Sequence, residues 1–243
     1  MIPLNHPRYR SLVTRERMAD CTRSGIVALE GLTAHGRGEA FDYLLGEQTS
    51  VSAAEAERLA AALLMRAEHP VISVNGNTAA LCAEAIADLQ EASGALVEVN
   101  LFHRTEERIE KITRMLEEAG CRVLQGPVAR HIPLDHDRGL CHADGIAAAD
   151  VILVPLEDGD RAGALVHMGK TVIAIDLNPL SRTAQMATLP IIDEVTRAIP
   201  AITQAIRTRQ PGEYEQKPLR ICSKDLLREA IVSIKRRLDD VLD

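Results

Sequence analysis

The 243-residue sequence contains no Trp and only two Phe and three Tyr residues, so it offers few rings on which bases could stack. A protein that binds single-stranded nucleic acid by stacking needs such rings, and this class is therefore disfavoured. The five cysteines are scattered, and no two of them have the spacing Cys-x-x-Cys. We therefore expect neither a disulfide framework nor a zinc knuckle, and no metal held by these thiols.

Positive charge is also in short supply, because 28 Lys and Arg residues stand against 35 Asp and Glu residues, for a formal net charge of −7. General nucleic-acid binding rests on a broad basic surface, which this balance does not offer. No apolar run approaches the length of about 20 residues that crosses a bilayer. Residues 1–10 lack the apolar segment of a signal peptide, so we expect a soluble, cytoplasmic protein without nucleic-acid or membrane partners.

From residue 70 onward, short runs rich in Val, Ile and Leu alternate with stretches of helical periodicity. The predicted strands cover residues 70–74, 95–99, 121–124, 150–155, 171–175 and 190–193. Several of these runs are nearly all apolar, which is typical of parallel strands covered by helices on both faces. The alternation predicts an α/β fold with a Rossmann-like open, mostly parallel sheet and flanking helices.

Residues 1–69 show no strand pattern and predict a helical N-terminal layer packed on the sheet. Within this layer, the capping box from Ser52 to Glu55 should open a helix. In the core, Thr105 is the predicted N-cap of a helix that ends at Gly120. We divide the chain into this layer, a core over residues 70–209, and a linker with a last helix over residues 210–243, which together form one compact domain.

The last helix is predicted over residues 223–242, after a turn-rich stretch near residues 210–212. Its apolar side chains recur on one stripe at helical spacing. The stripe favours a helix that docks on its own domain, and a dimer clasp is the alternative.

Polar residues follow four of the predicted strands, in residues 75–77, 100–105, 156–161 and 176–183. Ligands of open parallel sheets bind beyond the carboxyl ends of the strands, so these turns should meet at one edge. Their side chains can hydrogen-bond a ribose, neutralise phosphates and hold a hydrated Mg²⁺ ion. The residues predicted to contact substrate are Asn75, Asn77, Asn100 and Arg104.

A further candidate segment, residues 34–43, contains Gly36 and Gly38 in helical surroundings. A glycine inside a helix costs about 1 kcal/mol relative to Ala, so another requirement should have placed them there. A close approach to an anion beside His35 and Arg37 would explain them, and so would a tight helix–helix corner. The segment does not match the dinucleotide fingerprint, because Phe41 occupies the third glycine position.

Six blocks of the sequence carry a family resemblance. They are HPRY at residues 6–9, AHGRGEAFDY at 34–43, ISVNGN at 72–77, EVNLFHRT at 98–105, VPLEDGDR at 154–161 and IDLNPLSRTA at 175–184. Over residues 2–205 the chain closely resembles the archaeal phosphopantothenate synthetases, the 4-phosphopantoate–β-alanine ligases of coenzyme A biosynthesis. The resemblance implies a homodimeric, cytoplasmic ligase that uses ATP as co-substrate and releases AMP and pyrophosphate, and we expect Mg²⁺ with the ATP.

The resemblance also implies which residues contact the nucleotide. They are Arg15, Arg37, Asp176, Leu177, Asn178, Arg182, Thr183, Glu194 and Val195. Two positions depart from the family pattern, because Glu194 stands where Asn is expected and His103 where Tyr is expected. At Glu194 an amide donor is lost, although a carboxylate can still accept a hydrogen bond from a base or ribose.

A carboxylate is a poor acceptor for an amine, so ATP must first convert it to an acyl-adenylate. The carboxylate and the phosphates of ATP are both negatively charged, so cations must bring them together. We assign this role to Arg37, Arg182 and Mg²⁺. The ammonium group of β-alanine must then lose a proton, and the candidate bases are His35, Asp158 and Asp160.

Other functions stay open from the sequence. The chain could be a non-catalytic adenine-nucleotide-binding module, which would bind ATP without releasing pyrophosphate. It could be another nucleotide-dependent α/β transferase or an NAD-dependent dehydrogenase, although the incomplete glycine fingerprint counts against the dehydrogenase. A pure dimer scaffold leaves the clustered arginines and asparagines unexplained.

Overall fold

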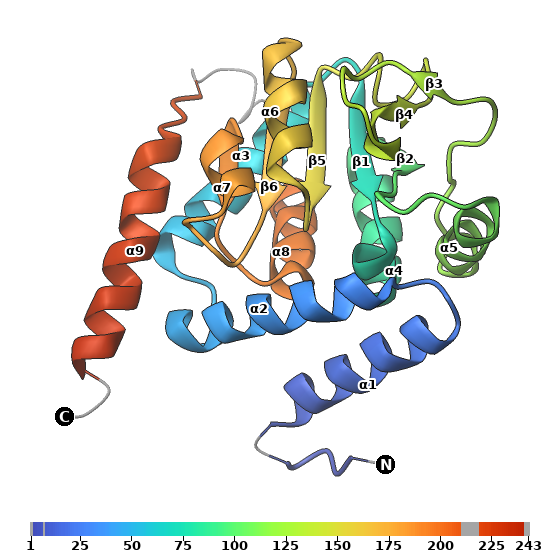
Figure 1. Ribbon diagram of the computed structural model, residues 1–243. Coiled ribbons are helices and arrows are strands. Elements are labelled where there is room, and N and C mark those ends of the chain that lie inside the picture. Colours follow the sequence, from blue (N-terminus) through green and yellow to red (C-terminus); the bar gives the residue numbers. More distant parts are fainter. Residues whose placement is uncertain (1, 7, 210–218, 241–243) are drawn as a thin grey trace.

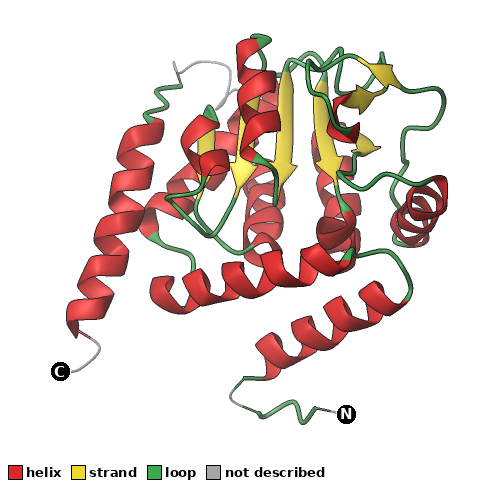
Figure 2. Ribbon diagram, in the orientation of Figure 1, coloured by secondary structure: helices red, strands yellow, loops and turns green. Residues whose placement is uncertain are grey.

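The protein is described by a computed structural model that covers residues 2–6, 8–209 and 219–240. At the centre of the described residues lies a five-stranded sheet whose strands all run parallel, in the order β2-β1-β5-β6-β7 (Figures 1 and 2). The strands are β1 (Pro70–Val74), β2 (Leu96–Val99), β5 (Val151–Pro155), β6 (Thr171–Ile175) and β7 (Leu189–Ile191). The predicted α/β fold with an open parallel sheet is confirmed.

The chain leaves β1 to form β2 on one side of it and returns to β5 on the other side. The boundary between β1 and β5 is therefore the topological switch point, where open α/β sheets form their ligand crevice. The paired register of β1 with β5 runs only from Pro70↔Val151 to Ile72↔Leu153, whereas β5 pairs with β6 as far as Pro155↔Ile175. Near its carboxyl end, β5 is thus paired by its backbone on the β6 side alone.

Helices α3 (Val51–Arg66), α4 (Gly76–Ser93), α5 (Glu106–Glu118) and α8 (Val195–Thr208) form the layer on one face of the sheet. Helix α1 (Tyr9–Arg23) packs against α4 and α2 (Leu29–Leu45). From the strands, Ile72, Leu153 and Ile173 are fully buried in this layer. Burial of each such side chain stabilises the fold by about 2 kcal/mol.

The opposite face is covered by α6 (Gly159–His167), α7 (Arg182–Met186) and a hairpin of β3 (Ala129–Arg130) with β4 (Leu140–Cys141), joined through the 3₁₀ turn η1 (Asp137–Gly139). The alternate strand residues Val71, Ile152 and Val172 pack into this second layer. Because both faces are buried, the strands are nearly continuous apolar runs, as the sequence predicted.

Helix α2 (Leu29–Leu45) crosses the molecule below the arrowheads of the strands in Figure 1, so it lies at the carboxyl edge of the sheet. Both Gly36 and Gly38 are inside this helix. A Cβ atom added at Gly38 would stand 3.4 Å from Leu177 Cδ1, which is ordinary van der Waals contact, and one added at Gly36 would meet no atom within 4 Å. The packing of α2 on the turn after β6 therefore does not by itself require glycine at either position.

Helix α9 (Ser223–Asp240) packs on the same chain, against α2, α3, α7 and β7. Its buried residues are Leu226 and Ala230, and the Arg237 guanidinium donates a hydrogen bond to the carbonyl of Tyr43 at 3.2 Å. The predicted turn-rich stretch at residues 210–212 and the last predicted turn of this helix lie outside the described residues. Within the described part of the chain, no helix has the length and apolarity to span a membrane.

Two predictions about local structure are wrong, and a third is confirmed. Residues 121–124 form a single bridge, from Val123 to Val97, because Gly126 and Pro127 follow after one residue and turn the chain away from the sheet edge. The cap of α3 is Ser50 and not Ser52, since the Ser50 hydroxyl accepts the bond from the Ala53 amide at 3.1 Å. Thr105 does cap α5, with its hydroxyl accepting from the Arg108 amide at 3.2 Å.

Arg197 on α8 joins α2 to the carboxyl end of β7 through two carboxylates. Its guanidinium donates to Asp42 Oδ1 on α2 at 2.6 Å and, through Nε, to Asp193 Oδ1 at 2.9 Å. The hydroxyl of Thr49 donates to the second oxygen of Asp193 at 2.6 Å. These charge-assisted bonds hold α2 in place across the end of the sheet.

Glu57 on α3 lies beside this group with 3% of its surface exposed. Burial, and next the negative charge of Asp193, raises the pKa of Glu57 to about 8, although Arg197 and Arg58 oppose the shift. With this pKa, Glu57 carries a proton at neutral pH.

Replacement of Glu57 by Gln should change how stability depends on pH. The unfolded chain releases this proton near the ordinary pKa of 4.5, while the folded protein keeps it to about pH 8. Wild-type stability should therefore fall relative to Glu57→Gln as pH rises through this window, by up to about 1.4 kcal/mol per pH unit. Urea unfolding of both proteins at several pH values measures the difference.

Glu55→Gln is the matched control, because Glu55 lies on the exposed side of the same helix. Its stability should follow that of the wild type at every pH. Parallel curves for wild type and Glu57→Gln would contradict the assignment of a buried, protonated carboxyl group.

Candidate active site

A cavity of about 500 Å³ opens at the carboxyl edge of the sheet. This volume is typical of sites for small molecules and cofactors. Its walls come from α1, α2, the start of α4, the turns after β5 and β6, and the start of α8. Nine of the residues predicted for the site line it: His35, Arg37, Asn77, Asp158, Asp176, Leu177, Asn178, Glu194 and Val195.

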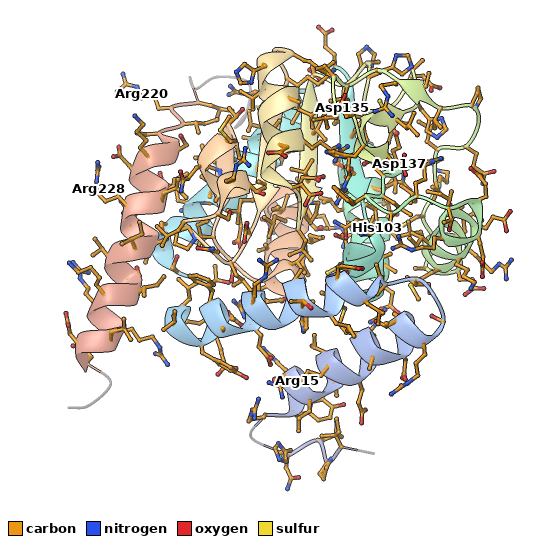
Figure 3. All side chains as sticks on the ribbon, in the orientation of Figure 1. Arg15, His103, Asp135, Asp137, Arg220 and Arg228 are labelled. Carbon is orange, nitrogen blue, oxygen red and sulfur yellow. The ribbon has the colours of Figure 1, made fainter. Side chains whose placement is uncertain are left out.

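Seven other predicted residues do not line this cavity: Arg15, Asn75, Asn100, Arg104, Asp160, Arg182 and Thr183. Arg15, labelled in Figure 3, pairs with Glu39 between α1 and α2, with 2.8 Å between Nη2 and Oε2. Arg182 is 78% exposed in its side chain and pairs with Asp160 at 2.7 Å. The sheet thus brings most of the predicted residues together and leaves these charged residues engaged elsewhere.

Three of the remaining polar residues make bonds that support the site's backbone. The hydroxyl of Thr183 donates to the Glu157 carbonyl at 2.6 Å. The amide of Asn100 is fully buried and donates to the Leu140 carbonyl at 2.9 Å. Asn75 donates to two carbonyls at the end of β5.

His103, the other departure from the family pattern, is exposed beyond the end of β2 (Figure 3). Its imidazole lies 3.9 Å from the Glu30 carboxylate and packs edge-on against the ring of Phe102, with 5.0 Å between centroids. It does not line the cavity.

Arg37 is the cation best placed to meet an anion in the cavity. Among the described residues, none forms a hydrogen bond or ion pair with its guanidinium. Asp176 lines the same cavity. Burial raises the pKa of Asp176, and the charge of Arg37 is among the influences that oppose this shift.

His35 stands on the same helix and is half-buried. Burial, assisted by the charge of Arg15, lowers the pKa of His35, although Glu39 opposes the shift. The imidazole is consequently neutral near pH 7, which is the form that can accept a proton from a substrate.

The turn after β6 presents oxygen atoms at fixed positions. Asp176 accepts hydrogen bonds from the Asn178 amide at 3.0 Å and from the Ser181 hydroxyl. The side-chain oxygen of Asn178 accepts from the Leu180 amide at 2.9 Å. These hydrogen bonds to the backbone and to Ser181 hold both side chains in fixed positions in the cavity lining.

Glu194 provides the cap of α8 at the far end of the cavity. Its carboxylate accepts from the Thr196 amide at 2.7 Å, and burial raises its pKa. An Asn at this position would cap the helix in the same manner, so the departure from the family pattern preserves this local function.

The turn after β5 contains a buried ion cluster that the sequence did not reveal. The Glu157 carboxylate pairs with Arg161 one helical turn later and with Arg138 from η1, whose Nη1 stands 3.3 Å away. Burial disfavours ionisation of Glu157, but Arg138 and then Arg161 outweigh it and hold its pKa below the ordinary value. The spacing of Glu157 and Arg161 is a detectable pair signal, whereas nothing in the sequence places Arg138 beside them.

Further cavity residues were also missed by sequence reasoning. They are Arg10, Ser11 and Thr14 on α1, Glu39 and Asp42 on α2, and Ser181, Thr196 and Arg197. Glu39, Asp42 and Ser181 lie inside the blocks of family resemblance but carry no signal of a role in the site. The residues of α1 and α8 reach this edge through the packing of those helices.

The described residues contain no group of three or more His, Cys, Asp or Glu side chains that could hold a metal ion. A Mg²⁺ ion carried by nucleotide phosphates needs only one or two carboxylates, which Asp158 and Asp176 can supply.

The sequence is similar to those of known proteins. A sequence profile described as phosphopantothenate/pantothenate synthetase matches residues 52–237. Proteins named 4-phosphopantoate–β-alanine ligase are similar along nearly the whole chain. The protein of Methanospirillum hungatei is 61% identical over 243 residues, covering 100% of both chains. That of Methanosarcina mazei is 48% identical over 98% of this chain and 95% of its own.

A third relative of the same name, from Thermococcus kodakarensis, is 50% identical over 88% of this chain and 84% of its own length. All three matches exceed by far the identity at which homologous chains share their fold and reaction class. The chain therefore belongs to the phosphopantothenate/pantothenate synthetase family and is a ligase that forms carbon–nitrogen bonds.

Proposed function

We propose that the protein condenses 4-phosphopantoate with β-alanine to give 4-phosphopantothenate in coenzyme A biosynthesis. ATP is the co-substrate and is cleaved to AMP and pyrophosphate. The observation that carries the proposal is the full-length identity of 61% to a relative named for this reaction, together with a cavity lined by six of the nine expected nucleotide residues. The resemblance also predicts a cytoplasmic homodimer.

The first step joins two anions. A carboxylate oxygen of 4-phosphopantoate attacks the α-phosphorus of ATP, and the bond to the β-phosphate breaks, so pyrophosphate leaves and an acyl-adenylate forms. Arg37 is positioned to neutralise charge that develops on the phosphates. Mg²⁺ bound to the phosphates would supply further positive charge, with Asp158 and Asp176 as its protein ligands.

In the second step the amine of β-alanine attacks the acyl carbon, and the bond between that carbon and the AMP oxygen breaks. The attacking nitrogen must first lose its extra proton. We assign this proton to His35, because burial keeps its imidazole neutral. Asp158 lines the same cavity and is the alternative acceptor, while Asp160 is held by Arg182 outside it.

Nucleotide recognition is proposed to follow the two turns at the cavity's wall. Asp176, Leu177 and Asn178 contact the ribose, and Glu194 with Val195 contact the base. Arg15, Arg182 and Thr183 would act from the rim or through the backbone. Asn77 contacts substrate from the start of α4, and Asn100 supports the neighbouring loop through its bond to the Leu140 carbonyl. Arg104 stays a predicted substrate contact.

Removal of the Arg37 guanidinium should slow the AMP-forming step. Arg37→Ala should lower kcat/KM for ATP by about a hundredfold or more, as for other lost charge-stabilising donors. Arg182→Ala should have a smaller effect, because Arg182 must leave Asp160 to reach a phosphate. Pyrophosphate release, measured with saturating 4-phosphopantoate and β-alanine, gives both values.

Arg228→Ala is the control for general loss of positive charge, because Arg228 is exposed on α9 and pairs with Asp225 (Figure 3). It should ligate at the wild-type rate. If Arg37→Ala had wild-type kinetics, the assignment of Arg37 to the proposed site would be wrong.

Substrate choice can be tested directly. AMP formation should require 4-phosphopantoate and β-alanine together, and replacement of 4-phosphopantoate by pantoate should abolish most of it. Activity with pantoate and not with 4-phosphopantoate would leave the reaction class unchanged but would show that the proposed substrate is wrong. ATP binding without AMP formation from either acid would instead favour a non-catalytic nucleotide-binding module.

A further inference from the structure

Leu156 has an unusual backbone conformation at the wall of the cavity. Its φ angle is +54°, in the left-handed region that favours glycine, and among the described residues the only other non-glycine residue of this kind is Glu47. Such conformations persist when surrounding contacts impose them, and they concentrate at functional sites. Leu156 lies directly after β5 and lines the cavity.

Hydrogen bonds from both sides impose this conformation. The Leu156 amide donates to the Ile175 carbonyl on β6 at 3.0 Å. On the other side, the Asn75 side-chain amide donates to the Leu156 carbonyl at 2.9 Å and to the Pro155 carbonyl at 3.1 Å. The backbone pairing of β1 with β5 stops at Ile72↔Leu153, so the Asn75 side chain joins these strands at the switch point.

The polar atoms of Asn75 are occupied by the protein itself. Its amide nitrogen donates to the two carbonyls, and its side-chain oxygen accepts from the Thr78 amide at 3.0 Å and the Thr78 hydroxyl at 3.2 Å. The residue is 8% exposed and does not line the cavity. This geometry opposes the sequence prediction that Asn75 contacts substrate directly.

The turn that Asn75 holds contributes a wall of the site. Leu156, Glu157 and Asp158 line the cavity in succession, and α6 begins directly after them. The Glu157 carbonyl accepts from the Thr183 hydroxyl, and the Asp158 amide donates to the Glu157 carboxylate at 2.8 Å. A change in the Leu156 peptide would therefore displace the whole wall.

We propose that Asn75 is a positioning residue, which holds Leu156 in its left-handed conformation so that the segment from Leu156 to Asp158 forms the wall of the ATP and substrate cavity. The inference rests on the proposed function for its kinetic test only. It assigns to Asn75 a mechanical role through the backbone, with no contact to ligand.

Asn75→Ser isolates this role. Serine still caps α4, because its hydroxyl can accept from the Thr78 amide, but it is too short to reach the carbonyls of β5. With these two bonds lost and the turn left in a strained conformation, kcat/KM should fall about tenfold or more. The fall in kcat/KM should be present at a temperature well below the melting temperature of the variant, where the variant is folded. If the wall serves ATP binding, the change should lie mainly in KM.

A second substitution distinguishes positioning from direct contact. Glycine adopts a φ of about +54° without strain, so Asn75→Ser with Leu156→Gly should recover most of the lost kcat/KM. Asn75→Ser with Leu156→Ala removes nearly the same side chain but keeps the Cβ atom, and it should not recover. The single variants Leu156→Gly and Leu156→Ala provide the baselines.

Recovery with glycine and not with alanine would support the proposal. Equal behaviour of the two double variants would overturn it, and so would wild-type kinetics in Asn75→Ser. If the wild-type protein does not ligate, the proposed function fails separately. The melting temperatures of the same variants then test the turn, because glycine should restore the melting temperature lost in Asn75→Ser and alanine should not.

Discussion

All strands of the described sheet run in the same direction, and this constraint determines where polar chemistry can gather. Strands that are buried on both faces have no place for polar side chains along most of their length. Polar residues therefore gather mainly after the strand ends, and parallel strands end at the same edge. Helix α2 lies across that edge, held by Arg197, and closes the space into a cavity.

Half of the Arg, Asp and Glu residues that line the cavity form ion pairs within the protein. Arg138 and Arg161 neutralise Glu157, and Arg197 joins Asp42 to Asp193. These buried pairs fix the geometry of the walls, and breaking any of them would leave an uncompensated charge in a desolvated place. Because these carboxylates are paired with Arg138, Arg161 and Arg197, Arg37 stays available for a ligand.

The fold was predictable where local sequence and burial agree. The apolar runs that became β1, β5 and β6, and the cap at Thr105, were recognisable because two-sided burial and helix capping leave local patterns. The run at residues 121–124 has the same composition but lies at the sheet edge, where Gly126 ends its pairing after one bridge. Composition alone does not distinguish a full strand from such an edge contact.

The site was predictable in its turns and less so in its roles. Topology brought Asp158, Asp176 and Asn178 to one edge, as expected from the order of the strands. Sequence could not show that the Asn75 amide faces backbone carbonyls, or that Arg182 extends away toward Asp160, because those choices depend on side-chain packing. The match of Arg138 to Glu157 depends likewise on the hairpin of β3 and β4, which has only two residues in each strand.

The position of α9 has a consequence for the behaviour of the isolated chain. Strand β7 is the last strand of the sheet, and α9 packs beside it. An uncovered edge strand offers unpaired amides and carbonyls to strands of other molecules, which leads to aggregation. By occupying this border, the carboxyl-terminal helix prevents strands of other molecules from pairing with β7. A shortened chain without this helix would therefore aggregate, although it would still contain the proposed catalytic residues.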